Sequence, residues 1–250
     1  LCCPKNARVL IPKGTYPVTA LFLKSDMILE LQENAVLAGI YDRARTPILP
    51  GQIEYDNEDG YYNLGSWEGN PIDSFASMIT GIHVKNVTIC GKGVLDGRAD
   101  FENWWSRPKD KIRAWRPRMI FLNHCENITV VGVTVQNSPA WNLHPYFSNQ
   151  IRFLDMEVKG PANSHNTDGC DPESCTNVEI AGVHFSVGDD CIAIKSGKIY
   201  MGKKFKVPSK HIHIRQSWMQ DGHGAVTVGS EIAAGVDDIH ISIFLSVRSH

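Results

Sequence analysis

The sequence predicts an all-β chain that winds as a right-handed parallel β-helix, a solenoid of stacked coils with three strands each. Three observations favour this fold. Helical apolar periodicity is scarce, because Gly, Pro or Asn interrupts every candidate run. Short alternating apolar runs bounded by turn residues occur throughout the chain. One such strand pattern also recurs at a nearly regular interval.

The recurring strand begins after a polar turn residue and then alternates apolar and polar residues. Six segments show this pattern: 86–89, 127–130, 150–153, 177–180, 211–214 and 238–241. From the second segment onward, another strand is expected to start five positions after the first apolar residue, as from Ile128 to Val133 and from Ile239 to Phe244. A third strand follows, as at 191–195 and 225–228. Earlier in the chain, 9–11 and 28–31 are expected to be strands of the same kind.

A unit of three strands and their turns is the repeat of a parallel β-helix, because one coil cannot bury its apolar face alone. The longest interval, between Val178 and Ile212, contains the extra residues 197–208, which we expect to form a loop. A propeller or a sandwich is the alternative fold. Both favour hairpins with two-residue turns, and the sequence has no series of them.

Composition limits the classes of function. The 250 residues are 42% hydrophobic and 21% charged, which predicts one globular domain or at most two, and the repeat predicts a single β-helix domain over residues 1–250. A net charge of −2 gives no general reason to bind nucleic acid or a membrane surface, and no apolar run approaches the roughly 18 to 20 residues that cross a bilayer.

The seven cysteines lack zinc-site spacing and are expected to be free, mostly buried thiols. We expect a monomer without metal or other cofactor.

Three segments carry polar residues that the repeat does not require: 166–169, 188–191 and 222–225. They recur about one coil apart, and coils stack about 4.7 to 4.9 Å apart, so we expect Asp168, Asp189, Asp190 and His223 to share one face. Two carboxylates a coil apart can reach the roughly 6.5 to 9.5 Å that holds a water in inverting glycosidases. Their repulsion raises at least one pKa, so that one carboxyl acts as acid and another as base.

Polar turn residues also have a simpler explanation, because Asn and Asp satisfy turn backbones. We prefer this explanation for five asparagines: Asn86, Asn127, Asn149, Asn163 and Asn177. It fits Asp189 and Asp190 poorly, since adjacent carboxylates repel and a turn needs only one. His223 lies between two glycines, where no flanking side chain covers it.

In this order and spacing, Asn166-Thr167-Asp168, Gly188-Asp189-Asp190 and Gly222-His223-Gly224 resemble the signature of the polygalacturonase family of pectin-cleaving glycoside hydrolases, family 28. The flanking segments 186–197 and 222–230 resemble it too, and the similarity covers the chain from about residue 12 onward. The resemblance implies inverting hydrolysis of α-1,4-galacturonosidic bonds. It also implies a pectic polysaccharide or oligogalacturonide as substrate, and a secreted or periplasmic location.

The resemblance implies a role for each matching residue. Asp189 is expected to be the general acid, and Asp168 and Asp190 are expected to activate the hydrolytic water. His223 is expected to support protonation of the acid, and Asn166 to contact the substrate beside Asp168.

Four further sets of residues receive weaker interpretations. Lys195 either reaches a carboxylate of the sugar or is a solvated lysine at a strand end. Trp141 and the nearby His144 are both candidate substrate contacts, and Trp141 is the first choice for a contact with the sugar. The remaining tryptophans Trp104, Trp105 and Trp115 are expected to pack in the core. A metal site is not expected at His211, His213 and His240, since no third ligand follows at metal-site spacing.

The chain departs from the family pattern at both ends. The family's Arg-x-Lys motif, one coil beyond Gly-His-Gly, is not present before the final residue His250, and the family's capping helix would precede Leu1. We therefore expect a domain that lacks its N-terminal cap and its C-terminal coils. Insertions at 56–63 and after Ser196 can wall the groove, which favours exo over endo action, as does similarity to bacterial exo-acting members.

Other functions stay open. A related hydrolase of rhamnogalacturonan or xylogalacturonan shares the motifs, and a β-helical polysaccharide-binding protein shares the fold. A Ca²⁺-dependent lyase needs an Arg or Lys as its base, and neither residue type occurs inside the three motifs. For a polyanionic substrate, the expected cations are Lys195 and the insertion residues Lys203, Lys204 and Lys206.

Overall fold

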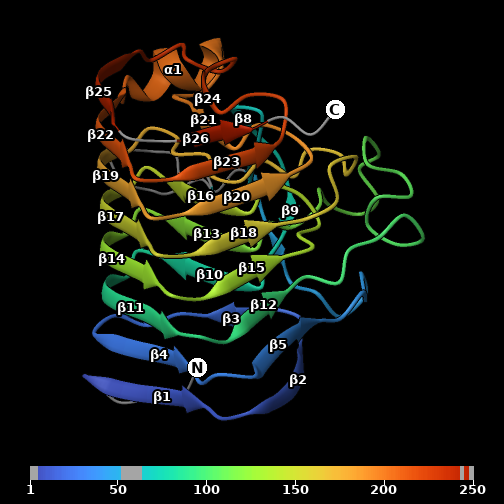
Figure 1. Ribbon diagram of the computed structural model, residues 1–250. Coiled ribbons are helices and arrows are strands. Elements are labelled where there is room, and N and C mark those ends of the chain that lie inside the picture. Colours follow the sequence, from blue (N-terminus) through green and yellow to red (C-terminus); the bar gives the residue numbers. More distant parts are fainter. Residues whose placement is uncertain (1–4, 52–63, 243–244, 248–250) are drawn as a thin grey trace.

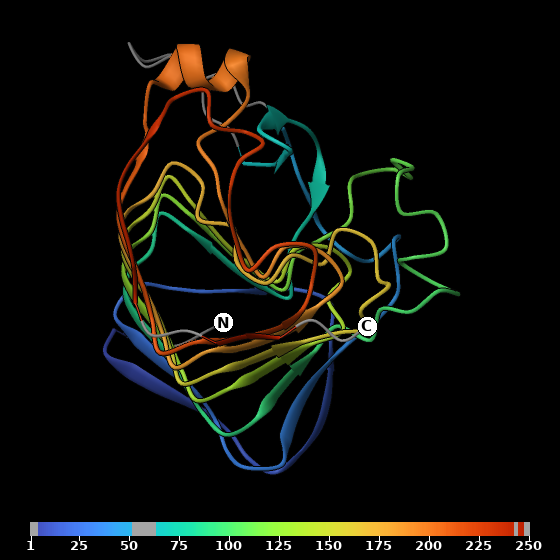
Figure 2. The same cartoon turned by 45° about the horizontal axis from the view of Figure 1, so that its top comes forward.

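The computed structural model describes residues 5–51, 64–242 and 245–247, and their strands form three parallel sheets along a solenoid (Figures 1 and 2). The first sheet contains β1 (Ala7–Ile11), β4 (Met27–Leu31), β11 (Lys85–Gly91), β14 (Glu126–Val131), β17 (Asn149–Leu154), β19 (Thr176–Ala181), β22 (Ser209–Arg215) and β25 (Val236–Ser242). The second contains β2 (Gly14–Val18), β5 (Ala35–Gly39), β12 (Val94–Asp96), β15 (Thr134–Gln136), β18 (Glu157–Lys159), β20 (His184–Val187), β23 (Trp218–Asp221) and β26 (Leu245–Val247).

The third sheet contains β3 (Leu21–Phe22), β10 (Ile79–Ile82), β13 (Ile120–Asn123) and β16 (Leu143–Tyr146), and the pair β21 (Ile192–Ile194) and β24 (Val226–Val228) continues it. One coil contributes only isolated bridges, in which Cys170 joins β16 to β21. Pro172 lies in this coil and lacks the N–H that a regular ladder needs. The three sheets confirm the predicted right-handed parallel β-helix.

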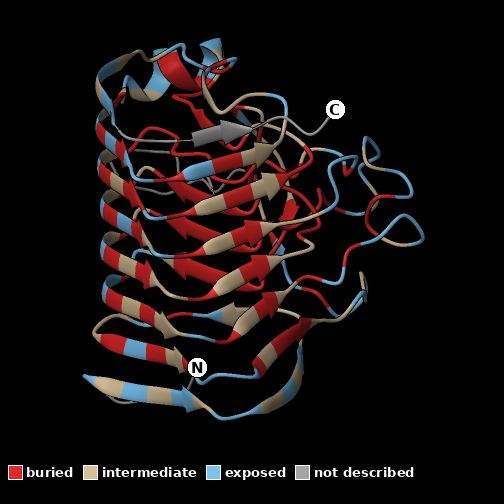
Figure 3. Ribbon diagram, viewed as in Figure 1, coloured by how far each residue is buried: buried red, intermediate tan, exposed pale blue. Residues whose placement is uncertain are grey.

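Equivalent residues of successive coils lie directly above one another, as the predicted repeat requires. Ile128 pairs with Ile151, which pairs with Val178, and the series continues through Ile212 to Ile239. Such inward-facing side chains form one apolar core along the axis, and Figure 3 shows buried and exposed residues alternating on the strands. The core therefore supplies packing that does not depend on the outer faces of the sheets.

The asparagine explanation is confirmed where the first-sheet strands begin. Asn86, Asn127 and Asn177 adopt left-handed backbone conformations (φ 55°, 55° and 57°), which asparagine tolerates better than most residues. Asn127 Nδ2 donates a hydrogen bond to Asn86 Oδ1 at 2.9 Å, and Asn177 donates to Asn149 at the same distance. These side chains form a ladder between coils.

The outer face of the third sheet is covered by short elements rather than by solvent. These are β6 (Ile48–Leu49) paired with β9 (Ser74–Phe75), β7 (Ser66–Trp67) paired with β8 (Asn70–Pro71), and helix α1 (Ile199–Phe205). Figure 2 shows α1 outside the coils on this side. Met201 of α1 packs with Leu49, Phe121 and Tyr146.

The insertion at 197–208 was expected to be a loop, and that prediction is wrong, because 199–205 forms α1. Met201 and Phe205 lie four residues apart on one helical face, and both pack over the third sheet, which stabilises the helix. The other expected insertion, 56–63, and the strand start at Phe244 lie outside the described residues. In the part of the chain that is described, no helix is long and apolar enough to cross a membrane.

The cysteine and tryptophan predictions agree with the structure where it describes them. Cys125, Cys170, Cys175 and Cys191 are free and buried, and Cys90 is free and half-buried. Of the tryptophans expected in the core, Trp104 and Trp105 pack around Phe75, and Trp115 packs against Trp67 and Trp141. Cys2 and Cys3 lie outside the described residues.

Candidate active site

The three polar motifs occupy the same turn in successive coils, after a second-sheet strand and before the third sheet. Gly169 N donates a hydrogen bond to Asp190 O at 2.9 Å, and Cys191 N donates to Gly224 O at 2.8 Å. These bonds stack the turn of Asp168 on that of Asp190 and the turn of Asp190 on that of Gly224. The predicted juxtaposition of the motifs is therefore confirmed.

The three carboxylates are closer than expected. One oxygen from each of Asp168, Asp189 and Asp190 lies within 4.8 Å of the others, so these oxygens are closer together than the roughly 6.5 to 9.5 Å predicted between the carboxyl groups. The hydrogen bond from Gly169 N to Asp190 O holds the two turns in contact, which brings these oxygens close together. One water fits this gap, because two hydrogen bonds of about 2.7 Å that meet at a tetrahedral angle span about 4.5 Å. Three carboxylates at this spacing are also suitable ligands for a hard cation such as Ca²⁺.

Burial and mutual repulsion control the charges of the cluster. Burial, followed by the negative charge of Asp189, raises the pKa of Asp168 to about 8, although Lys195 opposes this. Burial is also the main cause of the raised pKa of Asp190, and Asp189 adds to it. Asp168 therefore holds a proton at neutral pH, as expected for crowded carboxylates.

His223 lies at the exposed rim of the cluster, beside Asp189. Its Nδ1 is 3.1 Å from Asp189 Oδ1, and its side chain is 72% exposed. Gly222 permits this approach, since it adopts φ 83° and a Cβ there would lie 2.6 Å from the carbonyl oxygen of Asp189. The sequence prediction of an accessible imidazole next to the carboxylates is confirmed.

Asn166 also lines the pocket, and a buried arginine holds it. Arg116 Nη2 donates a hydrogen bond to Asn166 Oδ1 at 2.8 Å, and Nη1 donates to the carbonyls of Pro139 and His165 at 2.7 and 2.9 Å. Because Arg116 occupies the amide oxygen, Asn166 can offer a ligand its N–H groups. Sequence reasoning missed Arg116.

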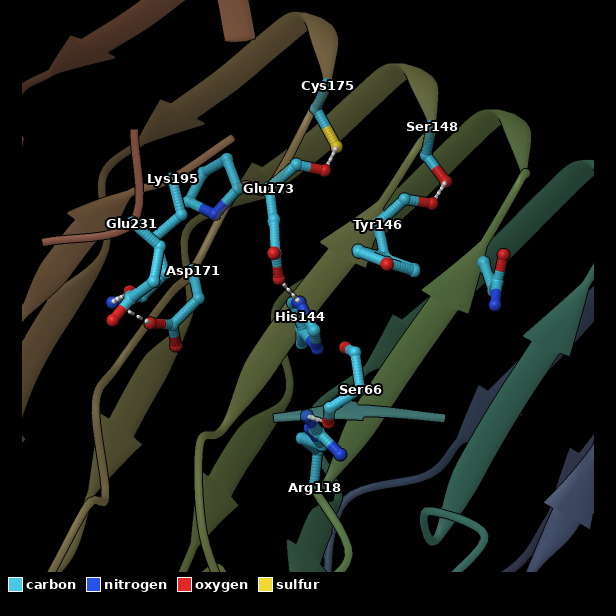
Figure 4. A network of polar contacts seen from close by, with 12 residues as sticks. Ser66, Arg118, His144, Tyr146, Ser148, Asp171, Glu173, Cys175, Lys195 and Glu231 are labelled. Carbon is cyan, nitrogen blue, oxygen red and sulfur yellow. Dashed lines mark hydrogen bonds and ion pairs between the residues drawn. The ribbon is translucent and has the colours of Figure 1, made fainter. Parts of the chain in front are cut away.

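Lys195 is buried behind the carboxylates and is paired (Figure 4). Its Nζ lies 2.8 Å from Glu231 Oε2, 3.9 Å from Asp171 Oδ1 and 5.0 Å from the ring centre of Trp141. Burial lowers its pKa, but Asp171, Asp168 and Glu231 together outweigh burial and raise it. The alternative of a solvated lysine is therefore wrong. Lys195 is a permanent cation in the pocket wall.

The prediction that His144 contacts the substrate is wrong, because its side chain is fully buried and is not among the described residues that line the pocket. His144 Nε2 lies 3.0 Å from Glu173 Oε2 on the outer face of the third sheet. Burial, followed by Arg118 and Lys195, lowers the pKa of His144, whereas burial raises that of Glu173 to about 7. This network supports the pocket from behind (Figure 4).

The pocket has a volume of about 170 Å³ and is lined by Trp67, Glu68, Trp141, Asn166, Asp168, Asp189, Asp190, Lys195, Gly229, Ser230 and Glu231. Trp141 lines it as expected, although only 2% of the residue is exposed. Its ring stacks on that of Trp67, with centroids 4.9 Å apart and an interplanar angle of 27°. Trp141 therefore offers an edge rather than a platform.

The hairpin formed by β7 and β8 walls one side of the pocket. Glu68 Oε2 forms an ion pair with Lys198 Nζ at 3.1 Å, and the backbone N–H of Lys198 donates a hydrogen bond to the carbonyl oxygen of Gly69 at 3.2 Å. Gly69 adopts φ 67°, and a Cβ there would lie 2.3 Å from Lys198 N, so the two segments are in close backbone contact. This wall joins residues about 130 positions apart.

Sequence reasoning missed Glu231, Asp171 and Glu173 as partners of the pocket. Asp171 and Glu173 are two residues apart, the spacing of one strand face, a signal that could have placed these two together. Glu231 follows the Gly-His-Gly motif, and its carbonyl accepts a hydrogen bond from Ser196 N, one coil below. No local pattern pointed to Trp67.

Comparisons with known proteins agree with this geometry. The model of the glycosyl hydrolases family 28 matches residues 48–243. A probable polygalacturonase of Vitis vinifera is 30% identical over 247 residues, which cover 98% of this chain and 48% of the relative. An endo-polygalacturonase of Pectobacterium carotovorum subsp. carotovorum is 32% identical over 189 residues, which cover 71% of this chain and 44% of the relative.

The solved structure of an exopolygalacturonase from Thermotoga maritima is 27% identical and superposes with a TM-score of 0.80. The match covers 95% of this chain and 58% of that one. The chain spans about half the length of the curated relatives it matches. Similar proteins thus include one described as endo-acting and one described as exo-acting.

Proposed function

The chain belongs to the glycosyl hydrolases family 28, and on that premise we propose that it hydrolyses α-1,4-galacturonosidic bonds of polygalacturonan in pectin. The observation that carries the proposal is the cluster of Asp168, Asp189 and Asp190, within 4.8 Å of one another in a walled pocket, with His223 on Asp189. A secreted or periplasmic location and a monomeric state stay predictions.

In the mechanism that we propose, Asp189 protonates the glycosidic oxygen while Asp168 and Asp190 hold and activate a water. In the free protein the proton resides on Asp168, whose pKa is raised to about 8. The short distances allow one water to relay that proton to Asp189, so Asp168 and Asp190 are both ionised when water attacks. His223, 3.1 Å from Asp189, stabilises the carboxylate that remains after proton transfer.

A water held between two carboxylates attacks from the face opposite the leaving group, which inverts the anomeric configuration. A covalent mechanism would instead retain it. Proton NMR of the first product formed from an oligogalacturonide distinguishes the two. Early product with the configuration of the substrate bond would exclude the direct attack of water.

We propose exo action, in which the enzyme removes units from a chain end. The hairpin of β7 and β8 supports this, because Trp67 and Glu68 border the pocket and the pair Glu68–Lys198 fastens the wall. An exo enzyme releases the smallest product from the start and lowers viscosity slowly for each bond cleaved. An early ladder of oligomers with a rapid fall in viscosity would indicate endo action instead.

The charge of the pocket favours a second candidate substrate. Five carboxylates border it, from Glu68, Asp168, Asp189, Asp190 and Glu231, whereas Lys195 is the one cation among the described lining residues. A neutral sugar fits this balance more easily than a uronate does. Rhamnogalacturonan and xylogalacturonan contain such sugars, and comparing turnover on these polymers with that on polygalacturonan decides between the candidates.

The proposal is tested by incubating the purified protein with polygalacturonic acid, with and without EDTA. Reducing ends and the ultraviolet absorbance of unsaturated sugar are measured together. We expect reducing ends without unsaturated product, at the same rate in EDTA. Unsaturated product that EDTA abolishes would identify a Ca²⁺-dependent lyase, and polymer retention without new reducing ends would identify a binding protein.

A further inference from the structure

Three imidazoles and one carboxylate form a block on the outer face of the first sheet, on strands away from the pocket. His211 and His213 lie on β22, and Asp238 and His240 lie on the neighbouring strand β25. All four are exposed. The strands are parallel and in register, with His213 directly opposite His240.

The backbone explains why these side chains converge. His211 and Asp238 both adopt left-handed conformations, with φ 54° and 53°, at the position that asparagine occupies in earlier coils. Two residues later, His213 and His240 point to the same outer face, because side chains of a strand alternate. Two ligand-bearing positions on each of two adjacent strands therefore form a compact group.

Contacts within the block already orient its carboxylate. Asp238 Oδ1 lies 2.7 Å from His240 Nε2, and Oδ2 lies in hydrogen-bonding contact with His211 Nδ1. The rings of His213 and His240 are 5.1 Å apart between centroids. Donor atoms of His213, Asp238 and His240 all lie within 4.8 Å of one another. The sequence expectation that these histidines lack a third ligand is therefore wrong, since Asp238 supplies it.

The preceding coil does not continue the group. Its equivalent positions hold Asn177 and Glu179, and Glu179 is bound by Arg215 at 2.7 Å. A surface hollow of about 580 Å³ borders His211 and His213, so solutes can reach the block from this side. The metal-binding residue types are thus concentrated on β22 and β25, with an open approach.

We propose that His213, Asp238 and His240 bind a zinc-class divalent ion, with His211 or water as the fourth ligand. Two imidazoles and a carboxylate are typical ligands of Zn²⁺, which prefers four ligands at about 2.0 to 2.2 Å. The exposed side chains need only rotate to bring donor atoms from 4.8 Å to the spacing of a tetrahedral site. The ion joins β22 to β25 and fastens one coil to the next, a role separate from pectin hydrolysis.

The test is titration of the purified protein with Zn²⁺ alone, after treatment with a chelator. We expect saturable binding in the micromolar range, and at least tenfold weaker binding in the double variant His213→Asn, His240→Asn. His83→Asn is the matched control, since His83 lies beside His124 in another pair of coils, with ring centroids 5.2 Å apart. This variant should bind as the original protein does. Circular dichroism without metal checks that each variant is folded.

Co²⁺ and NMR separate this site from the carboxylates of the pocket. A nitrogen-ligated tetrahedral Co²⁺ site gives visible absorption bands, and the double variant should lose them. One equivalent of Zn²⁺ should shift the ring signals of His213 and His240 and leave those of His83 in place. Unchanged affinity in the double variant, or unshifted signals from both rings, would overturn the proposal.

Discussion

Replacing Asp168 by Asn should stabilise the protein and remove its activity. The pKa of Asp168 is raised from 3.8 to about 8, first by burial and then by the charge of Asp189. Between about pH 4 and 8, the folded state therefore holds a proton that the unfolded state has released. The stability of the original protein falls as pH rises through this window. Asn resembles the protonated carboxyl group in shape but does not titrate, so the variant avoids this loss of stability.

The magnitude follows from the same shift. One pKa unit is worth about 1.36 kcal/mol, and about three units separate the unfolded value from pH 7, which gives at most about 4 kcal/mol. Since the neighbouring carboxylates share protons with Asp168, we expect Asp168→Asn to raise the free energy of unfolding at pH 7 by about 2 to 4 kcal/mol. For a chain of this size, the melting temperature then rises by at least roughly 4 °C.

The assay is thermal unfolding of both proteins at pH 4.5, 6 and 7.5, with kcat measured in parallel. The gain in melting temperature should be smallest at pH 4.5, where the same arithmetic gives about 1 kcal/mol, and grow with pH, whereas kcat falls by at least about 10². Asp110→Asn, which alters an exposed ion pair with Arg107, is the control and should change stability by less than about 1 kcal/mol. A variant that is less stable at pH 7.5, or a gain that does not depend on pH, would refute the assignment of the buried proton.

Three further predictions concern the same pocket. Asp189→Asn should lower kcat by at least about 10² with little effect on substrate binding, as steady-state kinetics will reveal, and near-normal kcat would remove Asp189 from the role of acid. The value of kcat/KM should fall above about pH 8, where the pKa of Asp168 places the loss of the cluster's proton, and a profile that stays flat to pH 10 would contradict this. Lys195→Met should destabilise the protein by about 3 kcal/mol in denaturant titration, because Glu231 and Asp171 lose their shared cation. The double variant Lys195→Met, Glu231→Gln should recover part of the lost stability. No recovery would argue against a stabilising ion pair between Lys195 and Glu231.

The stacking of the three polar motifs could be predicted because a solenoid converts sequence interval into spatial position. Asp168 and Asp190 are one coil apart, and a coil repeats its turns at the same place. The spacing of their oxygens could not be predicted, since it depends on how far one turn is displaced relative to the next.

Burial on the outer face of the third sheet also could not be predicted. In sequence, Lys195 and His144 occupy outward positions of strands, which in a bare solenoid would be solvated. The hairpin at 66–71 borders the pocket that Lys195 lines, and helix α1 packs on Phe121 and Tyr146 beside His144. Neither element belongs to the repeat. The contact between Trp67 and Trp141 joins segments that are far apart in sequence, and no repeat in the sequence relates their positions. The helix itself was missed because seven residues are too few to show helical periodicity.

The position of the pocket explains how the fold tolerates its charges. The apolar core runs inside the coils, whereas Asp168, Asp171 and Glu173 are buried outside it. Burial raises the pKa of all three, so the cover imposes an electrostatic cost that Lys195 and Arg118 only partly offset. The stacked core can bear this cost because its packing does not depend on the cover. Burial raises the pKa of Asp168, and the proton held there is the one that the proposed acid needs. Loosening the pocket wall should therefore lower activity before it unfolds the solenoid.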